Sequence, residues 1–121
     1  MQNKPLVLTP GEPGGVGSEI AAKAWLALRA DAKQCFFLIG DAALVETRCK
    51  AAGIGISVQR IKTPTDTAEA FANALPVLHR ALPAPVETGR FSSPCAPWVI
   101  SAIDEAVKLC LSGATAAMVT C

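Results

Sequence analysis

Charged and aromatic side chains are scarce in this sequence of 121 residues. Charged residues make up 17% of the chain, aromatic residues make up 5%, and tyrosine is absent. The formal net charge is +1, and the basic residues form no continuous run. A nucleic-acid-binding protein would carry a concentrated basic surface. We therefore expect no nucleic-acid partner.

Long apolar stretches are missing as well. No stretch approaches the roughly 18–20 apolar residues that a membrane-spanning helix needs. Met1–Pro5 leads directly into a short apolar run and then Pro10-Gly11, whereas a secretory signal has a longer apolar region and a small-residue cleavage site. These features predict a cytoplasmic protein without a membrane partner.

Residues that bind metals are few and are not paired in the sequence. His79 is the one histidine, and the number of cysteines is five, with no pair at C-x-x-C spacing. A single histidine cannot build a metal site, so we expect no metal ligands in this chain, and we assign His79 a structural or surface role. The cysteines are predicted to be free, mostly buried thiols in a reducing compartment. They are Cys35, Cys49, Cys95, Cys110 and the terminal Cys121, whose role the sequence leaves open.

Apolar residues, in contrast, are abundant, at 51% of the chain. They recur with the spacing of alternating strands and helices. Buried strands are predicted at 6–8, 35–39, 75–78 and 116–119, and a half-buried strand is predicted at 54–61. Helices are predicted from Ser18, over 42–52 with Asp41 as N-cap and Gly53 as its end, and from Ser92 or Ser93 to Gly113. This order indicates an α/β fold with a largely parallel sheet and helices on both faces.

The helical spacing also predicts which side chains face the core. From Ser18 the predicted core face holds Ile20, Ala21, Ala24, Trp25 and Leu28, and the last helix has an apolar stripe at 99, 102, 103, 106, 107 and 110. Asp104 and Lys108 are four apart and are expected to pair. The segment 62–75 shows no regular pattern. Both tryptophans, Trp25 and Trp98, are expected in the core rather than at a cofactor.

The most informative segment follows the first predicted strand. Thr9 to Gly17 is dense in glycine and proline, and a helix begins at its end. Glycines permit tight turns and close approach of a ligand, and the unpaired N–H groups at a helix start suit a phosphate. Glu12 and Glu19 would oppose that anion, although they favour the helix dipole. On these grounds alone, a structural turn and a ligand-binding loop both remain open.

The same segment resembles a family signature. T-P-G-E-P-G-G-V-G-S-E, residues 9–19, is similar to the T-x-G-[DE]-P-x-G-[IV]-G-P-E opening of the 4-hydroxythreonine-4-phosphate dehydrogenases, with Ser18 in place of the usual proline. Phe37–Asp41 resembles the family's second strand with its G-D step. Ser112–Thr120 resembles the stretch before the family's T-x-P-[IV]-x-K loop. The resemblance covers the chain in order.

This resemblance implies a two-domain, isocitrate/isopropylmalate dehydrogenase-like fold and a homodimer. Family members oxidise 4-phosphooxy-L-threonine with NAD or NADP, and the β-keto acid then loses carbon dioxide, in pyridoxal phosphate synthesis. A divalent metal (Zn, Mg or Co) is held by histidines of both subunits. Those histidines come later than this chain, so residues 1–121 are expected to be the N-terminal α/β segment of a longer two-domain enzyme, inactive by itself and cut off at a strand end.

The resemblance implies that the glycine-rich loop borders the cofactor and the active-site cleft. The cofactor-binding candidates are Gly11, Glu12, Pro13, Gly14, Gly15 and Gly17. No catalytic residue and no metal ligand are assigned within the chain. Glu12 either orients a ligand or neighbouring loop, or caps local backbone N–H groups. Thr120, at the end of the last predicted strand, is a weaker candidate.

Three alternatives remain open at this stage. One is a related dehydrogenase acting on another four-carbon hydroxy-acid phosphate, such as threonate or erythronate phosphate. Another is a non-catalytic α/β module that holds a phosphorylated ligand, if the 121 residues are the whole protein. The last is a remnant without function.

Overall fold

The fold is built on one parallel β-sheet. A computed structural model describes residues 4–120. Five strands lie in the order β3-β4-β2-β1-β5, and every neighbouring pair is parallel. The strands are β1 (Leu6–Leu8), β2 (Phe36–Gly40), β3 (Val58–Ile61), β4 (Leu75–His79) and β5 (Met118–Val119). The predicted α/β fold with a parallel sheet is confirmed.

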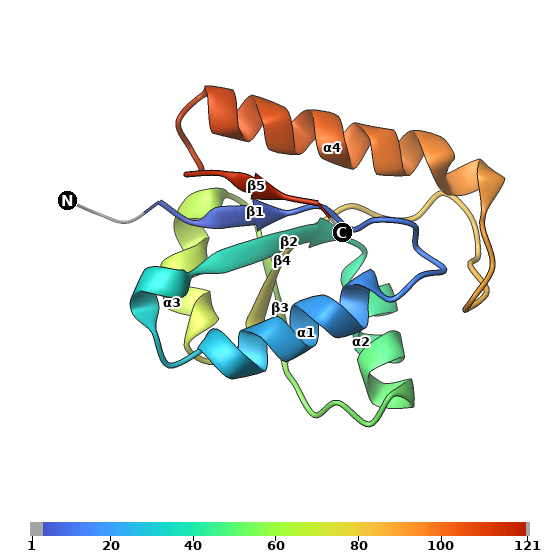
Figure 1. The fold of residues 1–121 in the computed structure, drawn as a ribbon, viewed down its shortest axis with the longest axis horizontal. Helices are drawn as coiled ribbons and strands as arrows, with labels where there is room; N and C mark the ends of the chain where they lie inside the picture. The colour runs from blue at the N-terminus through green and yellow to red at the C-terminus, as the bar shows by residue number, and fades with distance from the viewer. Residues whose placement is uncertain (1–3, 121) are drawn as a thin grey trace.

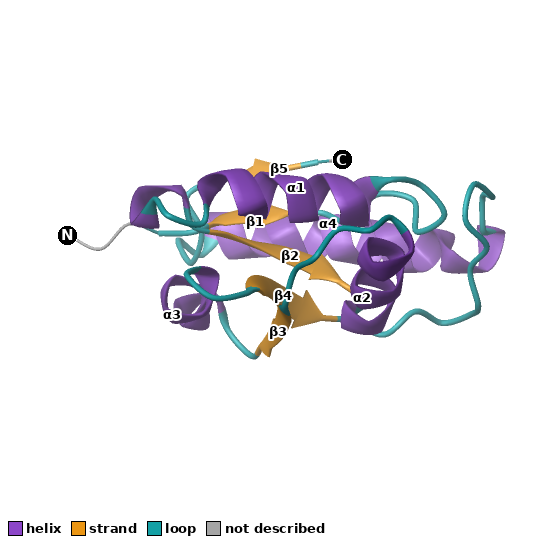
Figure 2. Cartoon of the chain, turned by 90° about the horizontal axis from the view of Figure 1, so that it is seen from below, coloured by secondary structure: helices purple, strands orange, loops and turns teal. Residues whose placement is uncertain are grey.

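Helices connect the strands and cover both faces of the sheet. They are α1 (Gly17–Leu28), α2 (Ala42–Ala51), α3 (Thr67–Phe71) and α4 (Ala96–Leu111), with short 3₁₀ turns at Ala32–Gln34, Pro64–Asp66 and Ser93–Cys95. Helices α1 and α2 lie on one face and α4 lies on the other (Figures 1 and 2). No helix within residues 4–120 is long and apolar enough to cross a membrane.

The core is divided into two layers by the sheet. Phe36 and Leu38 belong to the cluster under α1 and α2, together with Trp25. Phe37 and Ile39 belong to the cluster under α4. Successive side chains of a strand point to opposite faces, so a strand buried on both faces must be apolar throughout. This explains why the run Phe36–Ile39 shows no alternation.

Several predicted helix ends and pairs are confirmed. The Asp41 carboxylate accepts hydrogen bonds from the backbone N–H groups of Ala43 (3.0 Å) and Leu44 (3.3 Å) at the start of α2. Gly53 and Gly113 follow α2 and α4 with φ of 72° and 83°, where a side chain would be strained. Lys108 and Asp104 pair at 2.9 Å on α4.

Two predicted strands were too long. Only Val58–Ile61 of the predicted segment 54–61 is a strand, and the residues before it pack Ile54 and Ile56 against the core without pairing. Of 116–119, only Met118 and Val119 form β5, and Val119 is 47% exposed rather than buried. It is exposed because β5 lies at the edge of the described sheet.

Some predicted helical faces were also wrong. On α1 the predicted core face is confirmed for Ala21 and Trp25, which are buried together with Ala22. It is wrong for Ile20, which is 52% exposed. On α4, Ala102 and Ala106 are buried, but Ile103 and Val107 are each 38% exposed because they lie on the side that the sheet does not cover.

Two local predictions near helix starts were incomplete. The segment 62–75, which shows no regular pattern in the sequence, contains α3 and a capping box formed by Thr63 and Asp66. Before α4, a 3₁₀ turn begins at Ser93, and no serine hydroxyl in the described chain caps it. Ser92 occupies the N-cap position of that turn, but its side chain accepts no capping hydrogen bond there, so the predicted serine cap of α4 is wrong.

Candidate functional site

The glycine-rich loop, residues 9–17, joins the C-terminal end of β1 to the start of α1. Its first residue, Thr9, is buried, and the Thr9 N–H donates to the carbonyl of Val119 at 3.0 Å, beside β5. Gly11 has a φ of 68°, so the turn out of the strand needs glycine there. The loop therefore lies at the C-terminal ends of the parallel strands, where ligands of open α/β folds bind.

The loop uses part of its own hydrogen-bonding capacity internally. The Gly14 N–H donates to Oε1 of Glu12 at 3.2 Å, and the Gly15 N–H donates to the carbonyl of Glu12 at 2.9 Å. Oε1 of Glu12 also accepts from the N–H of Ser92 at 3.2 Å. Of the interpretations left open for Glu12, the structure has two: it caps local N–H groups, and it ties down a neighbouring loop.

Gly14 is the contact point with that neighbouring loop, residues 83–92. Its carbonyl accepts a hydrogen bond from the Gly89 N–H at 2.7 Å. A Cβ atom on Gly14 would lie 2.1 Å from the carbonyl oxygen of Arg90. Only glycine fits, because the two backbones pass each other at close range. Gly14 is thus required here by packing, whether or not a ligand is bound.

Arg48, on α2, holds the other side of the loop. Its side chain is 7% exposed. Nη1 donates to the carbonyl of Pro13 (3.2 Å), and Nη2 donates to the carbonyls of Gly14 (3.4 Å) and Gly15. Arg48 was not among the residues predicted from the sequence. The available signal was an arginine placed three residues after Val45, on the apolar face of a helix.

The start of α1 keeps backbone donors that the loop does not use. The first N–H groups of a helix have no acceptor within it, and among the described residues no side chain caps the Val16 position. Glu19, in this first turn, pairs with Arg48 at 3.6 Å. The loop candidates therefore divide into internally bonded amides, at Gly14 and Gly15, and the helix start at Gly17.

A groove of about 610 Å³ runs beside the loop, between α1 and the β5 edge. It is mainly apolar, and Thr120 lines it, as expected of a residue at the end of the last strand. The lining residues are Leu6, Leu8, Pro10, Gly11, Glu12, Gly15, Val16, Gly17, Ile20, Ala24, Leu28, Phe36, Val119 and Thr120. The groove thus joins the glycine-rich loop to the uncovered side of α1.

Hydrogen bonds join the C-terminal ends of β2 and β4 to each other's neighbouring segments. Nδ1 of His79 accepts from the N–H of Ala42 at 3.1 Å, and Oδ2 of Asp41 accepts from the N–H of Leu82 at 2.9 Å. His79 therefore has a structural role, as its isolation in the sequence indicated. The prediction that Trp98 lies in the core is wrong. Its side chain is partly exposed, and its Nε1 donates to the Arg80 carbonyl at 3.1 Å.

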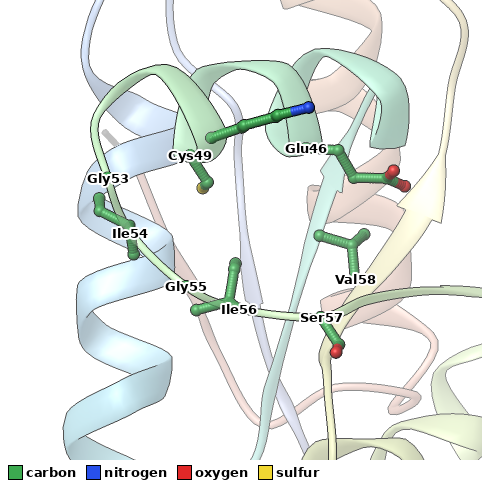
Figure 3. A pocket seen from close by; sticks show the side chains of 9 residues that line it. Glu46, Cys49, Gly53, Ile54, Gly55, Ile56, Ser57 and Val58 are labelled. Carbon is green, nitrogen blue, oxygen red and sulfur yellow. The ribbon is translucent and has the colours of Figure 1, made fainter.

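A second hollow, of about 620 Å³, lies between α2 and the segment 53–57, away from the loop (Figure 3). Cys49 lines it and is buried. Burial, and to a lesser extent the charge of Glu19, raises the pKa of the Cys49 thiol. A thiol that resists ionisation is a poor nucleophile, so this hollow offers no reactive cysteine.

The remaining candidate side chains are the cysteines and the residues that could bind a metal. Cys35, Cys49, Cys95 and Cys110 are free, with two of them buried and two partly buried, while Cys121 lies outside the described residues. Within residues 4–120, no group of three or more His, Cys, Asp or Glu side chains is placed to hold a metal ion.

Comparison with known proteins gives consistent results. A family model described as pyridoxal phosphate biosynthetic protein PdxA matches residues 32–121. The 4-hydroxythreonine-4-phosphate dehydrogenase of Caulobacter vibrioides is 44% identical over 120 residues, which are 99% of this chain and 34% of the relative. That of Methylorubrum populi is 38% identical, over 98% of this chain and 34% of the relative.

Solved structures match the fold. The 4-hydroxythreonine-4-phosphate dehydrogenase of Burkholderia phymatum superimposes with a TM-score of 0.86 at 23% identity, over 99% of this chain and 36% of that one. The enzyme of Klebsiella pneumoniae gives a TM-score of 0.85 at 23% identity, over 98% and 37%. The chain thus spans about a third of the length of the proteins that it matches.

Proposed function

Because the chain belongs to the pyridoxal phosphate biosynthetic protein PdxA family, we propose that it forms the N-terminal third of a 4-hydroxythreonine-4-phosphate dehydrogenase. The substrate is 4-phosphooxy-L-threonine, the hydride acceptor is NAD or NADP, and the oxidised product loses carbon dioxide. The observation that carries the proposal is the 44% identity to the Caulobacter vibrioides enzyme across 99% of this chain. That alignment includes the glycine-rich loop, which lies before the segment matched by the family model.

The role proposed for this segment is to bind and orient an anionic ligand beside the loop. The groups that would hold a phosphate are the free N–H groups at the start of α1, at Gly17 and Ser18. Gly11, Glu12, Pro13, Gly14 and Gly15 shape the backbone that leads to them. When bound, the nicotinamide ring would accept the hydride. The groove along α1 would then keep water away from one side of the ligand.

The remaining parts of the reaction would lie outside this chain. We propose that the metal ligands and the groups for the decarboxylation step lie in other segments of a full-length enzyme. This is supported by residues 4–120, where no group of three or more His, Cys, Asp or Glu side chains could hold a metal ion. We also propose that such an enzyme is a homodimer, as the resemblance implies. No catalytic residue is assigned within residues 1–121.

A chimeric enzyme tests the proposal. Residues 1–121 replace the 120 aligned residues of the Caulobacter vibrioides relative, and this protein is called the chimera below. When 4-phosphooxy-L-threonine, a divalent metal and NAD or NADP are supplied, we expect the chimera to form NADH or NADPH. The absorbance of the reduced nicotinamide measures this product. Omission of substrate gives the background rate. The isolated 121-residue chain is expected to be inactive.

The outcome is decisive when the chimera is folded. A cooperative thermal transition near that of the parent enzyme establishes folding. A folded chimera that fails to reduce NAD and NADP, under conditions in which the parent turns over, would contradict the proposal. Faster turnover of threonate or erythronate phosphate than of 4-phosphooxy-L-threonine would instead assign the chain to a related dehydrogenase.

A further inference from the structure

Arg48 is an ion buried among backbone groups rather than on the surface. Transfer of a charged side chain out of water is costly unless hydrogen bonds and an opposite charge compensate it. Here the guanidinium has both: the carbonyls of Pro13, Gly14 and Gly15 accept its N–H groups, and Glu19 supplies the charge. All of these partners lie in the glycine-rich loop or the first turn of α1.

We propose that Arg48 is a positioning residue that sets the shape and the charge of the glycine-rich loop for a phosphate-bearing anion. The inference rests on the proposed function, because it assumes that such a ligand binds at the start of α1. Arg48 does not touch the ligand in this proposal. It acts through the loop backbone and through Glu19.

The first effect is on the direction of the loop carbonyls. A carbonyl oxygen carries partial negative charge and repels a phosphate. The planar guanidinium presents several donors in a fixed geometry, which suits three neighbouring carbonyls. By binding the carbonyls of Pro13, Gly14 and Gly15, Arg48 turns them toward the interior next to α2. Lysine has a single ammonium on a flexible stem, so it would not reproduce this arrangement.

The second effect is on charge. Two carboxylates lie near the start of α1, where a bound anion would meet them. Glu12 is occupied by the N–H groups of Gly14 and Ser92. Oε2 of Glu19 pairs with Arg48, while Oε1 of Glu19 is buried and has no hydrogen-bond partner among the described residues. Removal of Arg48 would therefore leave an uncompensated negative charge in the first helical turn.

Variants of the chimera separate positioning from general stability. In Arg48→Met, we expect the KM for the anionic ligand to rise at least about tenfold, with a smaller change in kcat. Arg48→Lys should recover part of the loss, because it restores the charge without the fork of donors. The matched control is Phe71→Leu, a core substitution in α3 at the far end of the sheet (Figure 1). It should lower Tm while KM stays within about twofold.

The charge effect has its own test. Adding Glu19→Gln to Arg48→Met should lower KM relative to Arg48→Met alone, because the uncompensated carboxylate is removed. KM is measured separately for NAD(P) and for 4-phosphooxy-L-threonine. The ligand whose KM moves is the source of the phosphate at α1, and either answer supports the proposal. If neither KM moves more than in Phe71→Leu, Arg48 is only structural and the proposal is overturned.

Amide hydrogen exchange gives a result that does not depend on turnover. In Arg48→Met, Gly14, Gly15 and Gly89 should exchange faster than in the unchanged chimera, and faster than in Phe71→Leu when both are compared with their own core amides. Unchanged protection of these amides would overturn the positioning role. An unchanged chimera that is folded but inactive contradicts the proposed function instead, and the exchange measurement still decides the role of Arg48.

Discussion

The imidazole Nδ1 of His79 accepts a hydrogen bond from the backbone N–H of Ala42 at 3.1 Å, so the last residue of β4 caps the first residue of α2. Asp41 completes the junction, since its carboxylate binds two N–H groups of α2 and the N–H of Leu82. These bonds fix β2, β4 and α2 to one another at the C-terminal ends of the strands, where the glycine-rich loop also lies.

His79→Leu should destabilise the chimera by about 1 kcal/mol, the usual cost of losing a helix-capping acceptor. The Ala42 N–H would lose its partner while the apolar volume is kept. His79→Asn is the control, because its side-chain oxygen occupies a position similar to Nδ1 and can accept the same bond. Urea denaturation measures both. Equal loss in the two variants would show that the hydrogen bond is not the cause.

Gly14→Ala should destabilise the chimera by about 1–3 kcal/mol, the range for overpacking. The new methyl group would meet the Arg90 carbonyl, which is backbone and cannot rotate away. Gly55→Ala is the matched control, since among the described residues other than its two chain neighbours no atom lies within 4 Å of its added Cβ. The free energies of unfolding of the two variants should differ clearly. A Gly14→Ala protein as stable as Gly55→Ala would show that the two loops are not packed together.

Trp25→Phe should cost more stability than Trp98→Phe. Nε1 of Trp25 donates to the carbonyl of Phe71 at 2.7 Å in a buried position, so phenylalanine leaves an unsatisfied acceptor and a small cavity, together worth about 1–3 kcal/mol. The Trp98 bond to Arg80 is exposed to water, which can replace it. Thermal unfolding of both variants checks this order, which a larger loss for Trp98→Phe would reverse.

Asp66 should make a pH-dependent contribution to stability. Hydrogen bonds from the backbone N–H groups of Thr63 and Lys62 lower the pKa of the Asp66 carboxyl. A carboxyl whose folded pKa lies below its unfolded pKa stabilises the fold above the unfolded value, and this contribution is lost as pH falls through the folded value. The wild-type chimera should therefore be more stable than Asp66→Asn near pH 7. Urea denaturation from pH 7 down to pH 3 should show that difference shrinking, whereas a constant difference would contradict the assignment.

The sequence was sufficient where one physical signal dominated. Apolar runs predicted β1, β2 and β4, because a strand that is buried on both faces needs apolar side chains at successive positions. Asp41 and Gly53 correctly marked the two ends of α2, since capping and positive φ are local requirements. The glycine-rich loop was placed correctly between a strand and a helix, from glycine content and resemblance together.

The sequence was insufficient where partners distant along the chain decide the outcome. Nothing local shows that Val119 lies at a sheet edge, or that Ile20 faces a groove instead of the core. The role of Arg48 depends on carbonyls that lie more than thirty residues earlier in the chain. Likewise, glycine is needed at position 14 because the Arg90 backbone lies against it. The sequence around Gly14 does not show that these two loops meet.

The order of the strands has a consequence for how the chain acquires its structure. Of the described strands β1 is made first, yet it lies inside the sheet, with Val7 paired to Phe37 on one side and to Met118 on the other. Contacts between residues far apart in sequence slow folding. During synthesis β1 can gain β2 early, but its second edge stays open until nearly all of the described chain has left the ribosome. An unpaired edge of this kind favours aggregation, so the chain is most exposed to misassembly during this interval.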